Sequence, residues 1–466
     1  MSYSDGRRLA TLGALISVVQ LTQVAMSTTN YAVMGTLGVR HIAAGGLVLL
    51  LFNQIRSICV GVITGTENLV AIAVSSAEKR EVTPDSDLRA VLRSSFAIAT
   101  VSGVLGGLLL IGFGWSLQWL GQDAAVLDAA RPMIVALAPA LLPYLWFQVL
   151  RLYTIGMQRA QVASMVSVGA ALLNLVLVPC LVYGFGPLPA LRLTGIGAAT
   201  SVVFLLTAVV FWLLVRRDPA LNVALSVRIW PVRWPDVRAQ LRLGAPIALT
   251  FGSEAGIFSV LGLVIGTFGA ATLAAHNVVS QVVYVVLQAA VGLSHGASIL
   301  LSRAVFGGAY RQAHALTWLA VRQAAVIPAL AGLLYLLAPD WVLRWFLDGA
   351  ESAATLRIAH TFLCVAVVLQ FFDAAQTLGV GLLRGLTETG VGFRASLLGN
   401  WVVGLPVALL LTFPLGLGAI GVWLGLTAGL ATAAILMVND TLARLRGYLE
   451  ADGLPQRAAS RISETR

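Results

Sequence analysis

Three carboxylates lie inside apolar segments of this 466-residue chain, where an ionisable side chain is costly and is therefore a candidate for function. Glu254 stands in the segment GSEAG, and its small neighbours would let another helix come close. Asp373 shares one helix face with Gln370 and Gln376, which are three residues away on either side. A carboxylate near amide oxygens can bind Na⁺ or carry a proton, so we expect cation or proton coupling at Glu254 and Asp373. The alternative is a structural, permanently protonated acid.

The third carboxylate, Glu67, has two open interpretations. It could pair with Arg151 or Arg159 near a cytoplasmic helix end, or it could line a cavity in the first half of the chain. Arg159 and Arg384 occupy similar places in the two halves, and both are expected to extend to the membrane interface.

Polar and aromatic side chains in the other apolar segments could line a binding cavity. One stripe runs along a single helix face at steps of four, three, four and seven, through Asn277, Gln281, Tyr284, Gln288 and His295. Hydrogen bonds between helices would explain such a stripe as well as a cavity would. Together with the aromatic residues, the stripe suits an amphipathic organic solute, including a cationic one. The expected cavity residues are Asn30, Glu67, Tyr144, Gln281, Tyr284, Gln288, Gln370, Gln376, Asn400 and Trp401.

The elements that must position these residues are membrane-spanning helices. The chain is 58% hydrophobic and only 11% charged, which excludes an ordinary soluble enzyme and a nucleic-acid-binding surface. A helix crosses a bilayer in about 20 apolar residues. Twelve such runs are found, at 10–30, 42–75, 92–115, 130–153, 160–183, 193–215, 243–267, 274–302, 317–338, 358–384, 394–413 and 417–440.

Basic residues predict the orientation, because loops rich in Lys and Arg stay in the cytoplasm. Most of the 30 Lys and Arg residues fall inside when both termini are cytoplasmic, and several would touch anionic lipid. The predicted organisation is an N-terminal six-helix lobe (1–215), a cytoplasmic linker (216–242), a C-terminal six-helix lobe (243–442) and a polar cytoplasmic tail (443–466). With a single lysine among its basic residues, the composition suggests a high-GC bacterium, and therefore its inner membrane.

The two halves repeat each other at an offset of 231 residues. The segment VMGTLG at 33–38 recurs as VIGTFG at 264–269. At this offset Glu254 corresponds to Gln23, and at a later offset of about 225 Asp373 corresponds to Gln148, so the acidic pair belongs to the second half alone. Parallel repeats of six helices are a transporter architecture. The sequence thus predicts an all-α polytopic membrane protein, with twelve transmembrane helices in two pseudo-symmetric six-helix bundles.

The energy source must lie outside the polypeptide. Lys79, the single lysine, has no phosphate-binding glycine loop around it, so the chain is not an ATPase. We expect no cofactor, no nucleic-acid partner and a monomeric protein, with Na⁺ or H⁺ as the coupling ion.

Several short motifs, in this order and spacing, resemble the multidrug and toxic compound extrusion (MATE) family over residues 8–442. They are Met34-Gly35 with Gly38 and Ala43-Ala44, then Gly244-Ala245-Pro246, Ala274-Ala275-His276, Leu383-Arg384-Gly385 and Gly404-Leu405-Pro406. The resemblance implies a MATE-type fold and drug or toxin export. Glu254 and Asp373 match the acidic positions of the NorM-type branch, which are implicated in Na⁺ or H⁺ coupling. Where the family commonly has Asp in the first span, this chain has Asn30, which cannot release a proton near neutral pH.

The expected function is secondary active export of an amphipathic drug or toxin in exchange for Na⁺ or H⁺. A flippase for a lipid-linked or amphiphilic precursor is the alternative transport function. A polytopic acyl or glycosyl transferase is a third reading, but the sequence lacks a recognisable carboxylate or histidine cluster for it, so we do not expect an enzyme.

Overall fold

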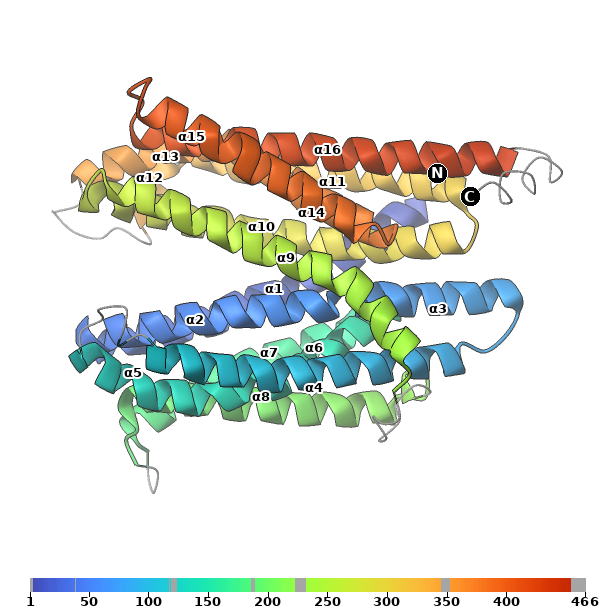
Figure 1. The fold of residues 1–466 in the computed structure, drawn as a ribbon, viewed down its shortest axis with the longest axis horizontal. Coiled ribbons are helices and arrows are strands. Elements are labelled where there is room, and N and C mark those ends of the chain that lie inside the picture. The colour runs from blue at the N-terminus through green and yellow to red at the C-terminus, as the bar shows by residue number, and fades with distance from the viewer. Residues whose placement is uncertain are drawn as a thin grey trace. The chain divides into compact units, whose positions relative to one another are not determined.

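The computed structural model describes residues 3–37, 39–116, 118, 124–185, 189–222, 232–344 and 353–453 (Figure 1). Within these ranges, twelve helices are long and apolar enough to cross a membrane, which confirms the predicted number of spans. Their positions agree with the prediction to within a few residues at most ends, and the fifth span, Ala160–Tyr183, agrees at both. In lipid a helix satisfies its own backbone hydrogen bonds, which explains why such apolar runs fold this way.

Several spans consist of more than one helical element. The elements, in order, are α1 (Tyr3–Thr36), α2 (Val39–Thr64), α3 (Thr66–Arg80), α4 (Asp85–Ser116), α5 (Ala124–Leu137), the short 3₁₀ helix η2 (Ala138–Ala140), α6 (Leu141–Gly156), α7 (Ala160–Tyr183), α8 (Arg192–Arg217), α9 (Trp234–Gly266), α10 (Ala270–Phe306), α11 (Tyr310–Leu337), α12 (Pro339–Arg344), α13 (Ala353–Gly385), α14 (Thr389–Leu397), the π-helical segment η5 (Leu398–Gly404), α15 (Leu405–Thr412) and α16 (Ala419–Gly453).

The long second span is interrupted at Gly65, between α2 and α3. Side chains explain the interruption, because the Ile63 carbonyl accepts hydrogen bonds from Thr66 Oγ1 at 2.6 Å and from Gln240 Nε2 at 3.2 Å. Gly65 has no side chain, and a Cβ there would lie 2.9 Å from Leu243 Cβ on α9. Side chains inserted into a helix ladder are a known cause of breaks and kinks. This joint fixes the start of α9 against α2 and α3.

The chain forms two compact units, one of residues 15–255 and one of residues 1–14 with 256–466. Both α1 and α9 therefore pass from one unit into the other. The predicted lobes, 1–215 and 243–442, stay a prediction, and these units divide the chain at different residues. Of the predicted linker, residues 223–231 lie outside the described residues, as do Gly38 and residues 454–466 of the predicted tail. Helix α16 continues to Gly453, through the first part of that tail.

Helices within each unit pack closely through glycines. In the 256–466 unit, α10 lies against α13, and a Cβ on Gly385 would lie 2.7 Å from the Ser298 carbonyl oxygen. In the same unit, η5 and α16 meet where a Cβ on Gly399 would lie 2.6 Å from the Gly429 oxygen. Small residues allow such approach between membrane helices, where van der Waals packing replaces the hydrophobic effect.

A glycine substitution tests this packing. We expect Gly385→Ala to destabilise the protein by about 1–3 kcal/mol, because the new methyl group overlaps a backbone atom. The matched control is Gly390→Ala, on α14, where a Cβ would meet no atom within 4 Å. Thermal unfolding in detergent measures both. Equal shifts for the two variants would contradict the packing argument.

Candidate functional site

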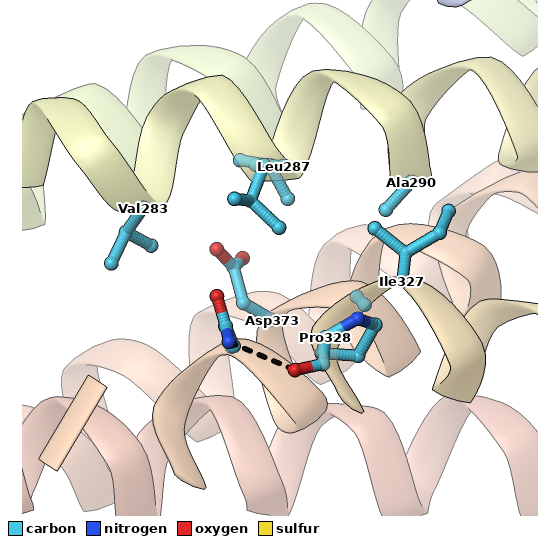
Figure 2. Close-up of a pocket in the computed structure, with 9 residues that line it drawn as sticks. Val283, Leu287, Ala290, Ile327, Pro328 and Asp373 are labelled. Carbon is cyan, nitrogen blue, oxygen red and sulfur yellow. Dashed lines mark hydrogen bonds between the residues drawn. The ribbon is translucent and has the colours of Figure 1, made fainter. Parts of the chain in front are cut away.

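Asp373 lies in a small pocket among three helices of one unit. The pocket is formed by α10, α11 and α13, and it leaves about 10 Å³ of space for the centre of a water-sized molecule. Figure 2 shows the Asp373 carboxylate directed toward Leu287 and Val283 of α10. A cavity needs about 10–15 Å³ of such space to hold one water molecule, so this pocket is of a size for a proton or a single water molecule and not for a drug.

Gln370 is the second polar side chain of this pocket. It is 3% exposed, and its Nε2 donates a hydrogen bond of 3.1 Å to the Pro328 carbonyl oxygen on α11, drawn as the dashed line in Figure 2. Its Oε1 is buried without a hydrogen-bond partner among the described residues. The remaining lining is apolar, from Val283, Val286, Leu287, Ala290, Ile327, Pro328 and Ala374. Asp373 and Gln370 are thus brought together as predicted, while the third member of the series, Gln376, is buried elsewhere and approaches Ser396 Oγ at 3.5 Å.

Glu254 lies on α9 in the 15–255 unit, close to the residue at which that unit ends. It is half-buried. Next to it, Gly256 meets the ring of Trp401, whose Cζ2 would lie 3.3 Å from a Cβ at that position. The expectation that small residues in this segment allow close approach is therefore confirmed at Gly256.

The polar stripe of α10 is divided between two environments. Asn277, Gln281 and Tyr284 are exposed at the protein surface, whereas Gln288 is buried. Gln281 and Tyr284 could therefore meet a solute or lipid, whereas Gln288 faces the protein interior. Among the other expected cavity residues, Asn400 is buried in the π-helical segment and its Oδ1 has no partner in the described part of the chain.

The first-half residues lie in the 15–255 unit. Asn30 and Tyr144 are both buried, and Asn30 Oδ1 has no partner among the residues described. Glu67 is 0% exposed, so it does not line an open cavity in this conformation. Arg159 pairs instead with Asp218, at 3.1 Å.

The expectation for Arg384 is wrong. Its side chain is only 3% exposed, and Nε donates to Ser298 Oγ at 3.2 Å, so it does not extend to the interface. The sequence placed it at a helix end, where Arg usually reaches water. The close packing of α10 on α13 at Gly385 keeps it inside instead.

Sequence reasoning did not predict a polar cluster around Arg56 of α2. Asn53 is a local partner on α2, but Gln23 and Tyr144 come from α1 and α6, far away in the chain, so no local motif marks the cluster. Nor did it predict that Leu287 and Pro328 would surround Asp373.

Among the described residues, no group of three His, Cys, Asp or Glu side chains could hold a metal ion.

Twelve apolar spans within the described residues, with an acidic residue in a pocket between helices, are typical of a membrane transporter. The sequence profile of the MatE family matches the chain twice, over residues 16–180 and 246–410. The two matches begin 230 residues apart, at 16 and 246, which confirms the internal repeat. The chain belongs to the MatE family of multidrug and toxic compound extrusion transporters, and it is a transporter rather than an enzyme on that ground.

Curated relatives place it near the NorM type. It is 34% identical to the probable multidrug resistance protein NorM of Pseudomonas aeruginosa, over 91% of this chain and 86% of that protein. It is 32% identical to the multidrug resistance protein NorM of Burkholderia vietnamiensis, over 92% of each.

Solved structures share the fold. A MOP superfamily transporter from Pyrococcus furiosus superposes with a TM-score of 0.86 at 19% identity, covering 95% of this chain and 96% of that one. The eukaryotic MATE transporter AtDTX14 gives a TM-score of 0.81 at 19% identity, covering 95% and 99%. The MATE-type, twelve-helix fold class predicted from the sequence is thus confirmed.

Replacing Gln370 tests the link between α11 and α13. We expect Gln370→Leu to lower the free energy of unfolding by about 1 kcal/mol, because the hydrogen bond to Pro328 is lost. Gln281→Leu is the control, since Gln281 is exposed and should change stability by less than about 0.5 kcal/mol. Thermal unfolding of both purified variants provides the measurement. A larger loss for Gln281→Leu would show that the hydrogen bond does not hold these helices together.

Proposed function

We propose that this protein exports an amphipathic drug or toxin in exchange for Na⁺ or H⁺, with ion coupling at Glu254 and at Asp373. The observation that carries the proposal is the Asp373 pocket, where an ionisable group and a buried amide oxygen face a small space inside the helices. The curated relatives are named multidrug resistance proteins, which supports a drug as the exported compound.

The lining of the pocket favours a proton over Na⁺. Only Asp373 and Gln370 offer side-chain oxygens, and the Pro328 carbonyl already accepts from Gln370. A hard cation takes several oxygen ligands, whereas a proton needs only one. Na⁺ at this site would require water molecules or a different helix arrangement to complete its shell.

Coupling then follows from differential binding. An ion bound at the carboxylates stabilises one conformation, and the substrate stabilises the other. Each therefore lowers the affinity for its competitor by the same factor, which is the condition for exchange.

The coupling residues are tested by dye efflux from proteoliposomes under an imposed pH gradient or an imposed Na⁺ gradient. We expect the pH gradient to drive efflux, and we expect Asp373→Asn and Glu254→Gln each to reduce it by about tenfold or more, since neither amide can release a proton.

The matched control is Asp87→Asn, which removes an exposed carboxylate that pairs with Arg80 at 3.1 Å and should leave efflux unchanged. If the Na⁺ gradient alone drives efflux, the coupling ion is Na⁺ and not H⁺. Efflux that persists without any gradient, or that survives both substitutions, would reject the coupling proposal and favour the flippase.

The proposed location is a bacterial inner membrane with both termini in the cytoplasm. Arg216 and Arg217 at the end of α8, and Arg303 at the end of α10, would then face the cytoplasm. Alkaline phosphatase, which is active only outside the cytoplasm, should be active when fused after Phe185 and inactive when fused after Gly453. The reverse pattern would invert the topology.

A further inference from the structure

Arg56 is a basic residue within a membrane span of the 15–255 unit. At about 1.5 Å per residue it lies about 18 Å along the helix from the start of the span at Ala44, more than half of a hydrocarbon core of about 30 Å. A charged side chain at that depth is costly unless it meets a partner or a hydrated cavity.

Its contacts are all to neutral groups. Nη1 donates to Tyr144 Oη at 2.6 Å and to Gln23 Oε1 at 3.4 Å, and Nε donates to Asn53 Oδ1 at 3.3 Å. The guanidinium carbon also lies 5.2 Å from the centre of the Tyr144 ring. No carboxylate lies within ion-pair distance of Arg56 in the described part of the chain, so its positive charge is solvated but not neutralised.

Unused hydrogen-bonding groups remain in the cluster. The second terminal nitrogen of Arg56, Nη2, makes no hydrogen bond to a described residue, and the residue as a whole is half-buried. Gln23 Nε2 is buried without a partner in the same set of residues. Gln148 donates to Tyr144 Oη at 2.7 Å, which holds the phenol in place, and its own Oε1 is also without a partner. Arg56 Nη2 and Gln23 Nε2 are therefore two hydrogen-bond donors without an acceptor among the described residues.

The repeat relates the Arg56 cluster to the Asp373 pocket, and the charge at the corresponding places is reversed. At the offset of 231, Arg56 corresponds to Leu287, and Gln148 corresponds to Asp373 at the later offset. Leu287 faces Asp373 in its own pocket (Figure 2). The equivalent places therefore carry a cation with an amide in one half and an apolar group with an acid in the other.

Aromatic rings stand beside the cation. Tyr144 lies 4.8 Å from Phe204 and 6.4 Å from Phe147, measured between ring centres. Tyr144 and Phe147 are buried, whereas Phe204 is half-buried, so Phe204 is the ring of this group with surface left for the apolar body of an amphipathic molecule whose charged end meets Arg56.

We propose that Arg56, with Gln23, binds an anionic oxygen group of the exported compound, so that the preferred substrates are amphipathic acids or zwitterions with a carboxylate-like end. A guanidinium nitrogen that makes no hydrogen bond to a described residue, together with a nearby amide N–H, matches the two oxygens of such a group. This inference rests on the proposed export function and names its substrate class.

Two rhodamine dyes test the proposal, because rhodamine 123 is the methyl ester of rhodamine 110 and differs only in lacking the free carboxylate. Fluorescence anisotropy with the purified full-length protein measures binding without any ion gradient, so a failure of ion coupling does not affect the result. We expect wild type to bind the acid about tenfold to a hundredfold more tightly than the ester. Arg56→Met should abolish this preference and keep ester binding, while Arg56→Lys keeps part of the preference.

Two further variants separate recognition from folding. Gln23→Leu leaves the guanidinium in place and should weaken binding of the acid several-fold, with no change for the ester. Arg216→Met is the matched control, because Arg216 also lies over an aromatic ring, 5.1 Å from the centre of Trp212, but at a helix end. Wild type that binds neither dye, or both equally, overturns the proposal. So does a preference for the acid that survives in Arg56→Met.

Discussion

A lipid bilayer offers no hydrogen-bond partner to a peptide group, and the whole structure depends on that constraint. Each span must satisfy its own backbone, so the described spans are helical. Where a helix departs from regular geometry, other groups take over the bonding. At Gly65 the side chains of Thr66 and Gln240 capture the Ile63 carbonyl, and the same bonds attach α9 to the α2–α3 joint.

The same constraint makes each polar side chain in a span informative. Asp373 and Gln370 gather where α10, α11 and α13 meet, and the pocket beside them is otherwise apolar. Arg384 turns inward to Ser298 instead of reaching water. In each case a polar group inside the membrane lies against protein, and the helix packing decides which group it meets.

The two halves share a framework, but their interiors differ. The MatE profile matches both halves at corresponding positions. Yet an acid and a leucine in one half, Asp373 and Leu287, correspond to an amide and a cation in the other, Gln148 and Arg56. Two repeats of one fold can thus hold groups of opposite charge at corresponding places.

The sequence by itself determined the number of spans, the repeat, the family and the acidic residues, because hydropathy, periodicity and rare intramembrane charges are local properties of the chain. It correctly predicted that Gln370 and Asp373 lie close together, since a helix places residues three apart on one face. Only the tertiary structure decided that Arg384 and Glu67 are buried and that Arg56 contacts Gln23 and Tyr144. Those contacts join helices distant in the chain, and side-chain packing between helices, which no local pattern encodes, selects them.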